Sequence, residues 1–175
     1  MFKKILLGLA VVVVAVLGLA LTQPDSFSVQ RSASIQAPAE KLYPMVADFH
    51  RWGEWSPWEH LDPAMKRVHS GAASGPGAVY AWHGNDDVGA GRMEVLSARP
   101  PAQVAIKLDF IRPFEAQNTT EFSFVPHGNG TLVTWGMTGP MPFVSKLMQV
   151  FVSMDKLIGK DFEAGLAKMK AVAEK

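Results

Sequence analysis

The hydrophobic and polar positions divide the chain into a short apolar part and a longer mixed part. Residues 5–21 are 17 consecutive residues without a charged or polar side chain, and they follow the charged pair Lys3 and Lys4. At 1.5 Å per residue, a helix of this length spans about 25 Å, close to the shortest that crosses a bilayer core. The run has no polar face to meet solvent, which disfavours a core helix of a soluble domain. We therefore expect a membrane-directed helix here.

Two interpretations of this helix remain open. A cleavable signal peptide has an apolar core of roughly 7 to 15 residues followed by small residues, and residues 18–20 offer such a cleavage site. An uncleaved anchor has roughly 17 to 25 apolar residues, which suits this run better. The two lysines keep residues 1–4 in the cytoplasm under the positive-inside rule. The sequence thus predicts a single-pass membrane protein with its domain on the extracytoplasmic, periplasmic side, or a secreted or periplasmic domain if the helix is cleaved.

A linker at residues 22–27 leads to a folded domain over residues 28–175. Residues 28–36 alternate as in a strand and end before Pro38, which suits the first position of a helix. A short amphipathic helix is predicted over residues 39–49. Its apolar positions at helical spacing are Leu42, Met45, Val46 and Phe49.

Beyond residue 63 the pattern changes to a period of two, which is typical of strands. Six further strands are expected between Gly-, Pro- and Asn-rich turns, at residues 66–70, 78–84, 91–98, 103–111, 114–125 and 131–138. Short turns between successive strands imply antiparallel pairing. Apolar residues share one face in each strand, and these faces are expected to line one concave surface: Tyr80 and Trp82; Met93 and Val95; Val104, Ile106 and Leu108; Phe122 and Phe124; Val133, Trp135 and Met137.

One long C-terminal helix is expected to cover that surface. Its apolar stripe recurs in steps of three and four from Pro142 onward, at Leu147, Phe151, Met154, Ile158, Phe162, Gly165, Met169 and Val172. Gly159 and Gly165 each cost a helix interior about 0.5 to 1 kcal/mol relative to Ala, so we expect a close approach to the sheet or to a ligand there. Residues 143–152 are apolar nearly all round, which predicts deep burial or a lid hinged near residues 139–142.

The connection after the first helix is rich in tryptophan. Trp52, Trp55 and Trp58 recur at three-residue spacing and either form ordinary core or line an apolar pocket. Glu54 and Glu59 lie in the same loop. Carboxylates beside indoles can act as acids or bases, but the favoured interpretation is two solvated loop charges.

Composition narrows the functions that the domain can have. Without Lys3, Lys4 and Asp25, the chain carries 15 Lys and Arg against 15 Asp and Glu, so the domain is neutral. A neutral domain without a basic stripe argues against nucleic acid as a partner. The chain has no cysteine, which excludes disulfides, thiolate nucleophiles and cysteine-based metal sites.

Sequence motifs for catalysis or metal binding are absent. The five histidines are widely spaced and form no pair with metal-ligand spacing, so no metal and no cofactor are expected. His83 follows the inward Trp82, and alternation points it outward. Asn118 begins a sequon in form, but it lies within a predicted strand. No nucleophile motif or nucleotide fingerprint occurs, so no catalytic residue is assigned.

Taken as a set, several short segments make the chain resemble the START-type helix-grip superfamily, also called SRPBCC, and its polyketide cyclase/dehydrase-like branch. The matching segments are residues 37–38 (AP), 55–58 (WSPW), 82–85 (WHGN), 89–93 (GAGRM), 130–135 and 158–163 (IGKDFE). The resemblance covers roughly residues 28–173. It implies an α+β helix-grip fold, in which a seven-stranded antiparallel sheet wraps around a long C-terminal helix. It also implies a hydrophobic tunnel for lipids, sterols, polyketides or similar molecules, but it does not imply catalysis.

Three functions follow as hypotheses. The first is membrane-tethered binding of a small hydrophobic ligand, such as a lipid, isoprenoid or polyketide-like molecule, between the sheet and the C-terminal helix. The second is an enzyme of the cyclase/dehydratase type, with Glu54, Glu59, Arg92 and Glu94 as candidate polar residues. The third is an envelope interaction protein without a ligand, in which residues 143–152 dock a partner or the bilayer. The expected ligand-binding residues are Trp52, Trp55, Trp58, Tyr80, Trp82, Met93, Ile106, Leu108, Phe122, Trp135, Met137, Phe151, Met154 and Ile158.

Overall fold

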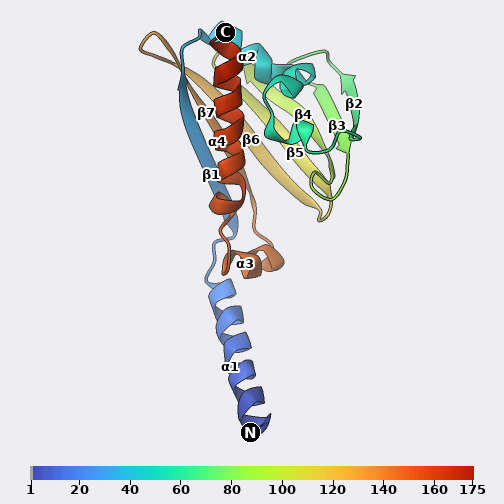
Figure 1. The fold of residues 1–175 in the computed structure, drawn as a ribbon, viewed down its shortest axis with the longest axis vertical. Coiled ribbons are helices and arrows are strands. Elements are labelled where there is room, and N and C mark those ends of the chain that lie inside the picture. The colour runs from blue at the N-terminus through green and yellow to red at the C-terminus, as the bar shows by residue number, and fades with distance from the viewer. Residues whose placement is uncertain (1) are drawn as a thin grey trace.

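The computed structural model describes residues 2–175, which form an N-terminal helix and one α+β domain (Figure 1). The N-terminal helix, α1 (Phe2–Leu21), projects from one end of the domain. The domain begins with strand β1 (Ser26–Ile35), two residues earlier than the sequence predicted. Only residues 22–25 therefore connect α1 to the sheet.

The remaining elements follow in the predicted order. After β1 come helix α2 (Ala39–Ala47) and two 3₁₀ turns, η1 (Phe49–Glu54) and η2 (Pro57–His60). The other strands are β2 (Lys66–Gly71), β3 (Ala78–His83), β4 (Ala90–Arg99), β5 (Gln103–Arg112), β6 (Ala116–His127) and β7 (Gly130–Pro140). The chain ends with α3 (Phe143–Gln149) and α4 (Met154–Ala173).

The seven strands form one antiparallel sheet in the order β1-β7-β6-β5-β4-β3-β2. Strands β2 to β7 are neighbours in sequence and in space, whereas β1 pairs with β7 at the far edge. The connection from β1 to β2, which contains α2, η1 and η2, must therefore cross the sheet. Helix α4 lies along the concave face (Figure 1), so the predicted helix-grip fold is confirmed.

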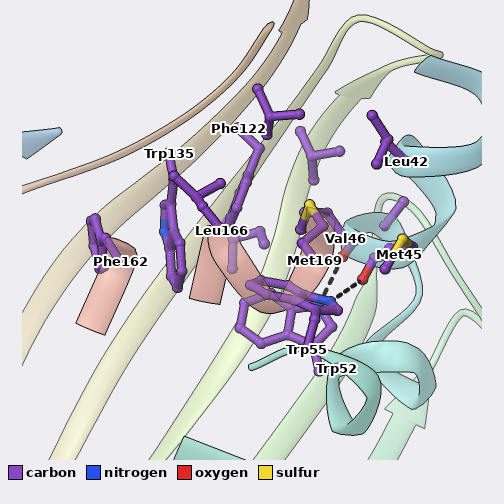
Figure 2. Close-up of a cluster of buried hydrophobic side chains, with 14 of the residues drawn as sticks. Leu42, Met45, Val46, Trp52, Trp55, Phe122, Trp135, Phe162, Leu166 and Met169 are labelled. Carbon is purple, nitrogen blue, oxygen red and sulfur yellow. Dashed lines mark hydrogen bonds between the residues drawn. The ribbon is translucent and has the colours of Figure 1, made fainter. Parts of the chain in front are cut away.

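The predicted faces of the strands form the core. Val95, Val104, Phe124 and Val133 are buried on the concave side of the sheet, as alternation along each strand requires. Helix α4 covers them with Phe162, Leu166 and Met169, while α2 adds Leu42 and Met45 (Figure 2).

Two of the loop tryptophans fasten α2 to this core. Trp52 Nε1 donates to the Val46 carbonyl at 3.0 Å, and Trp55 Nε1 donates to the Met45 carbonyl at 2.8 Å (Figure 2). Carbonyls in the last turn of a helix have no partner within the helix. The indoles satisfy two of them while burying their rings.

The C-terminal stripe forms two helices, not the single long helix that the sequence predicted. Residues 150–153 interrupt it, and Ser153 caps α4 by accepting a hydrogen bond from the Lys156 backbone N–H at 3.3 Å. The side chain of Phe151, which the stripe placed inside, is 71% exposed. The apolar periodicity continues through the break, so it gives no sign of the change in direction.

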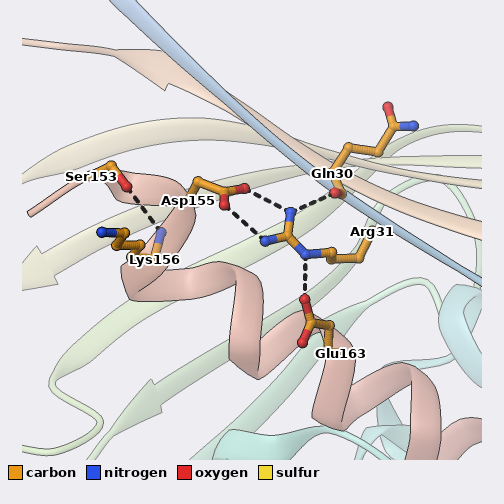
Figure 3. A network of polar contacts seen from close by, with 6 residues as sticks. All are labelled: Gln30, Arg31, Ser153, Asp155, Lys156 and Glu163. Carbon is orange, nitrogen blue, oxygen red and sulfur yellow. Dashed lines mark hydrogen bonds and ion pairs between the residues drawn. The ribbon is translucent and has the colours of Figure 1, made fainter.

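An ion-pair cluster fastens the first half of α4 to the edge strand β1 (Figure 3). The Arg31 guanidinium donates to Asp155 at 2.7 and 2.9 Å and to Glu163 at 2.6 Å. Arg31 holds the pKa of Asp155 below its usual value, through these hydrogen bonds more than through charge at a distance. A Cβ on Gly159 would overlap the Arg31 guanidinium. This glycine therefore makes room for Arg31 and not for a ligand, contrary to one expectation from the sequence.

The segment expected to act as a hinge is held in place. Strand β7 remains paired with β1 as far as Pro140, and the backbone N–H of the buried Met141 donates to the Asp25 carbonyl at 2.7 Å. The Asp25 side chain accepts a hydrogen bond from Lys146 of α3 at 2.5 Å. Residues 139–142 are thus tied to the end of the linker, and the break in the C-terminal helix lies about ten residues later, at 150–153.

Candidate functional site: an apolar cavity

A cavity of about 330 Å³ lies between the concave face of the sheet, η2 and the start of α4. It occupies the end of the sheet from which α1 leaves, where the β3–β4 turn and the β5–β6 turn border it. Such a volume lies within the range of small-molecule sites, and an apolar wall with few polar groups is typical of them.

Ten of the fourteen expected ligand-binding residues line this cavity. They are Trp52, Trp58, Tyr80, Trp82, Met93, Leu108, Trp135, Met137, Met154 and Ile158. They come from η1, η2, four strands and α4, so only the folded sheet brings them together.

The other four lie elsewhere. Trp55, Ile106 and Phe122 are fully buried in the core and do not border the cavity. Trp55 and Phe122 lie among core side chains of α2 and α4 (Figure 2), and Ile106 belongs to the same core cluster. Alternation assigns a residue to a face but not to a position along the strand, which explains the difference. Phe151 lies on the surface because the helix breaks beside it.

Trp58 forms the wall between the cavity and the core. Its ring stands perpendicular to that of Trp135 at a centroid distance of 5.7 Å, and it meets Phe162 edge-on at 6.4 Å. Trp135 is stacked on Phe162 at 4.0 Å on one side and on Phe122 at 4.9 Å on the other. The half-buried indole of Trp58 therefore rests on a rigid aromatic stack.

A buried carboxylate supplies the main polar feature of the wall. Glu59 is only 8% exposed, so the interpretation as a solvated loop charge was wrong for this residue. Its Oε2 accepts from Arg67 Nε at 2.7 Å, and its Oε1 accepts from the Tyr80 hydroxyl at 2.6 Å. Burial, then the hydrogen bond to Glu59, raises the pKa of Tyr80, and the hydrogen bond that Arg67 donates to Glu59 raises the pKa of Arg67. The three groups form a closed network beside the cavity.

The other candidate polar residues do not reach the cavity. Glu54 is exposed and pairs with Arg51 at 2.9 Å. Arg92 and Glu94 pair with each other at 2.8 Å on the outer face, because Met93 between them points inward. Of the four, Glu59 alone remains as a candidate for chemistry.

Several lining residues were not predicted. Phe27 was assigned to the linker, and Met65 and Arg112 lie at strand ends where periodicity is weak. Phe110 could have been found, since it continues the alternation of Leu108. Asn118 and Thr120 continue the inward face of Phe122 in the same way. Asn118 is buried, so its sequon is not presented on the surface of the folded domain.

Histidines contribute little to the cavity. His83 is exposed, as alternation predicted. His50 and His69 stack at a centroid distance of 4.1 Å beside a second, smaller recess. Burial, and then the charge of His50, lowers the pKa of His69. Within residues 2–175, no three His, Cys, Asp or Glu side chains come together as they would around a metal ion.

The architecture and the apolar cavity define the class of protein. A seven-stranded antiparallel sheet that grips a C-terminal helix around an apolar cavity is a helix-grip fold. Residues 26–174 match the family described as "Polyketide cyclase / dehydrase and lipid transport", and the chain belongs to this family. Membership supports a ligand-binding or polyketide cyclase role. No curated protein sequence matches the chain in a direct comparison.

Solved structures share the fold at low sequence identity. Protein CV1439 from Chromobacterium violaceum has 13% identity and a TM-score of 0.60 over 87% of this chain and 99% of its own. The Aha1 dimer from Colwellia psychrerythraea has 15% identity and a TM-score of 0.60 over 85% and 96%. BexL, a di-domain ARO/CYC from the BE-7585A biosynthetic pathway, has 16% identity and a TM-score of 0.64 over 90% of this chain and 53% of BexL. The chain thus spans about half the length of BexL, and these similarities concern the fold alone.

Proposed function

We propose that this protein is a membrane-tethered binding protein that holds one small, largely apolar ligand in the cavity between the sheet and the start of α4. The observation that carries the proposal is the cavity itself, which has a volume of about 330 Å³ and is lined mainly by aromatic, Met and Leu side chains. A lipid, an isoprenoid or a polyketide-like molecule fits such a lining.

Binding without catalysis agrees with the state of the polar groups in the wall. Both oxygens of the Glu59 carboxylate accept hydrogen bonds from protein donors. The indole N–H of Trp82 donates a hydrogen bond to the Val88 carbonyl at 2.9 Å. The indole N–H of Trp135 donates one to the Thr120 hydroxyl at 3.3 Å. Polar groups that already hydrogen-bond to other protein groups can shape a pocket and orient a ligand without reacting with it.

Helix α1 supports the tether. It is the single described helix long and apolar enough to cross a membrane, and nearly all of its side chains are exposed in the isolated chain. A soluble domain would not expose so many Val and Leu side chains to water. We propose that α1 is an uncleaved anchor, with the two lysines on the cytoplasmic side and the domain on the periplasmic side.

A neutral fluorescent probe tests the binding proposal on the full chain in detergent micelles. N-phenyl-1-naphthylamine is expected to receive energy from the tryptophans of the cavity wall. The variant Leu108→Trp fills the cavity from β5 and should reduce saturable binding at least several-fold. The control Val125→Trp, on the outer face of β6, should bind as the native chain does. Equal binding by both variants would contradict the proposal.

The Glu59 network keeps a cyclase/dehydratase-type enzyme as a second candidate. A carboxyl group bonded to a phenol beside an apolar cavity can serve as an acid–base pair. If the protein is an enzyme, Glu59→Gln should abolish turnover of a polyketide-like substrate while the probe still binds. If it only binds, Glu59→Gln should leave the bound molecule chemically unchanged, as in the native chain, when it is recovered and analysed by mass spectrometry.

A further inference from the structure

An apolar surface lies beside the anchor, at the junction of α1 and α3. It is formed by five exposed side chains of α3 and the residues after it: Phe143, Val144, Met148, Phe151 and Val152. Val144 is 64% and Phe151 71% exposed. We call these five residues the α3 surface. Water-facing clusters of this kind usually mark an interaction site.

The α3 surface offers no charge to a partner. Residues 143–152 contain a single charged side chain, Lys146, and this side chain is turned to Asp25 of the linker at 2.5 Å. A protein-binding surface normally has a polar rim with hydrogen-bonding groups around its apolar centre. An uncharged helix face of Phe, Val and Met is instead typical of a segment that lies in the interface of a bilayer.

The position of α3 follows from its attachment to α1. Ala20 in the last turn of α1 is fully buried, and α3 lies next to the end of α1 from which the linker leaves (Figure 1). The link from α1 to β1 is four residues long, and the Lys146 contact and the Met141 hydrogen bond hold α3 to it. If α1 spans the bilayer, α3 must therefore lie at its surface.

We propose that the α3 surface inserts into the interface of the same bilayer that α1 spans, and so holds the end of the domain that contains the cavity beside the lipid phase. The inference rests on the proposed anchor. Met154 and Ile158, which line the cavity, follow Phe151 within two turns of α4. An apolar ligand dissolved in the membrane then reaches the cavity without crossing bulk water. The occupant of this surface is lipid and not a second protein.

The absence of native cysteine allows a direct test in the full chain. Single variants Val144→Cys, Phe151→Cys, Leu9→Cys in α1 and Val125→Cys on the outer face of β6 are labelled with a nitrobenzoxadiazole maleimide. All four positions are exposed, so labelling should leave the fold intact. The labelled chains are reconstituted into phosphatidylcholine vesicles that contain nitroxide-labelled lipid, which quenches only dyes in the bilayer.

We expect Leu9→Cys, Val144→Cys and Phe151→Cys to lose most of their emission and Val125→Cys to keep it. Quenching at Leu9 without quenching at 144 and 151 overturns the inference and leaves the anchor intact. No quenching at Leu9 overturns the anchor and the inference with it. Quenching at all four positions, Val125 included, also overturns the inference, because it shows the domain lying in the lipid without a preferred face.

Loading of the cavity provides the second readout. The double variant Val144→Ser, Phe151→Ser should take up N-phenyl-1-naphthylamine from vesicles several-fold more slowly than the native chain, measured by energy transfer from tryptophan. Its affinity for the probe in detergent should be unchanged, because neither residue lines the cavity. Equal uptake rates from vesicles would show that the α3 surface does not serve the cavity.

Discussion

At the scale of single residues, the three loop tryptophans divide between structure and site. Trp55 is fully buried and bonded to the Met45 carbonyl, and Trp52 is bonded to the Val46 carbonyl while one side of its ring borders the cavity. Trp58 is half-buried and also lines the cavity. The three tryptophans are equally spaced in the sequence but lie in three different environments.

This division predicts opposite outcomes for two matched substitutions. Trp55→Ala should lower the free energy of unfolding by about 3 to 5 kcal/mol, because it leaves a void in the core and an unpaired carbonyl. Trp58→Ala should cost less stability and weaken binding of N-phenyl-1-naphthylamine. Thermal melting and probe titration of both full-length variants measure the two effects. A loss of binding by Trp58→Ala that its melting curve fully accounts for would contradict a role in the cavity.

The lowered pKa of His69 is expected to make the stability of the fold depend on pH. Because the fold lowers the pKa of His69, the unfolded chain binds a proton at a pH where the folded chain does not. Stability should therefore fall as the pH decreases below about 6.5, the ordinary value for histidine, until the folded-state pKa is reached. The melting temperature of His69→Gln should decline less between pH 7.5 and pH 5. The control His83→Gln, at an exposed position, should follow the native chain, and identical curves for all three would exclude His69 as the cause.

At the scale of elements, α4 is held to the sheet by contacts of two kinds. Its first half depends on the ion pairs of Arg31, which are partly open to solvent. Phe162, near the middle of the helix, and Leu166 and Met169 in its second half are buried against the aromatic core. The half of α4 that borders the cavity is therefore held in part by ion pairs that solvent reaches, and we expect it to open more readily than the second half.

Substitutions at two glycines of α4 test the two kinds of contact separately. A Cβ on Gly165 would lie 2.8 Å from Trp135 Cζ3, and the stacked Trp135 cannot move away, so Gly165→Ala should cost about 1 to 3 kcal/mol of unfolding free energy. Gly159→Ala displaces only the flexible Arg31 guanidinium and should cost less. In an Arg31→Ala background, Gly159→Ala should become neutral or stabilising, because only the gain in helix propensity remains. Chemical denaturation measures all four variants, and an unchanged penalty for Gly159→Ala without Arg31 would contradict this account.

At the scale of the whole molecule, the sequence predicts the sheet better than the site. Period-two patterns such as Val104, Ile106 and Leu108 identify the inward face, because burial on one side of a sheet imposes the alternation. They do not say which end of that face is filled, so Ile106 belongs to the core and Leu108 to the cavity. The break at residues 150–153 leaves one local sign, the N-cap serine Ser153, which the continuous apolar stripe outweighed. The burial of Glu59 depends instead on Arg67 and Tyr80, which lie in two other strands. No local pattern records such contacts.

The arrangement of anchor, α3 and domain predicts the cellular fractionation of the protein. The full chain should remain in the membrane fraction after alkaline extraction and should retain its own N-terminus, because α1 is long enough to span the bilayer core. Sequencing of the N-terminus distinguishes the alternatives. A soluble periplasmic form that begins near Leu21 would establish a cleaved signal peptide and exclude the tether.

The most direct test of the central claim is to identify what the cavity holds. Full-length protein extracted from its own membrane in polymer-bounded discs is analysed by native mass spectrometry, together with Leu108→Trp and Val125→Trp. The account predicts one small apolar molecule per chain in the native protein and in Val125→Trp, and its loss from Leu108→Trp, whose new indole occupies the cavity. An apolar molecule retained equally by Leu108→Trp, or none above the lipid background in any of the three, would contradict it.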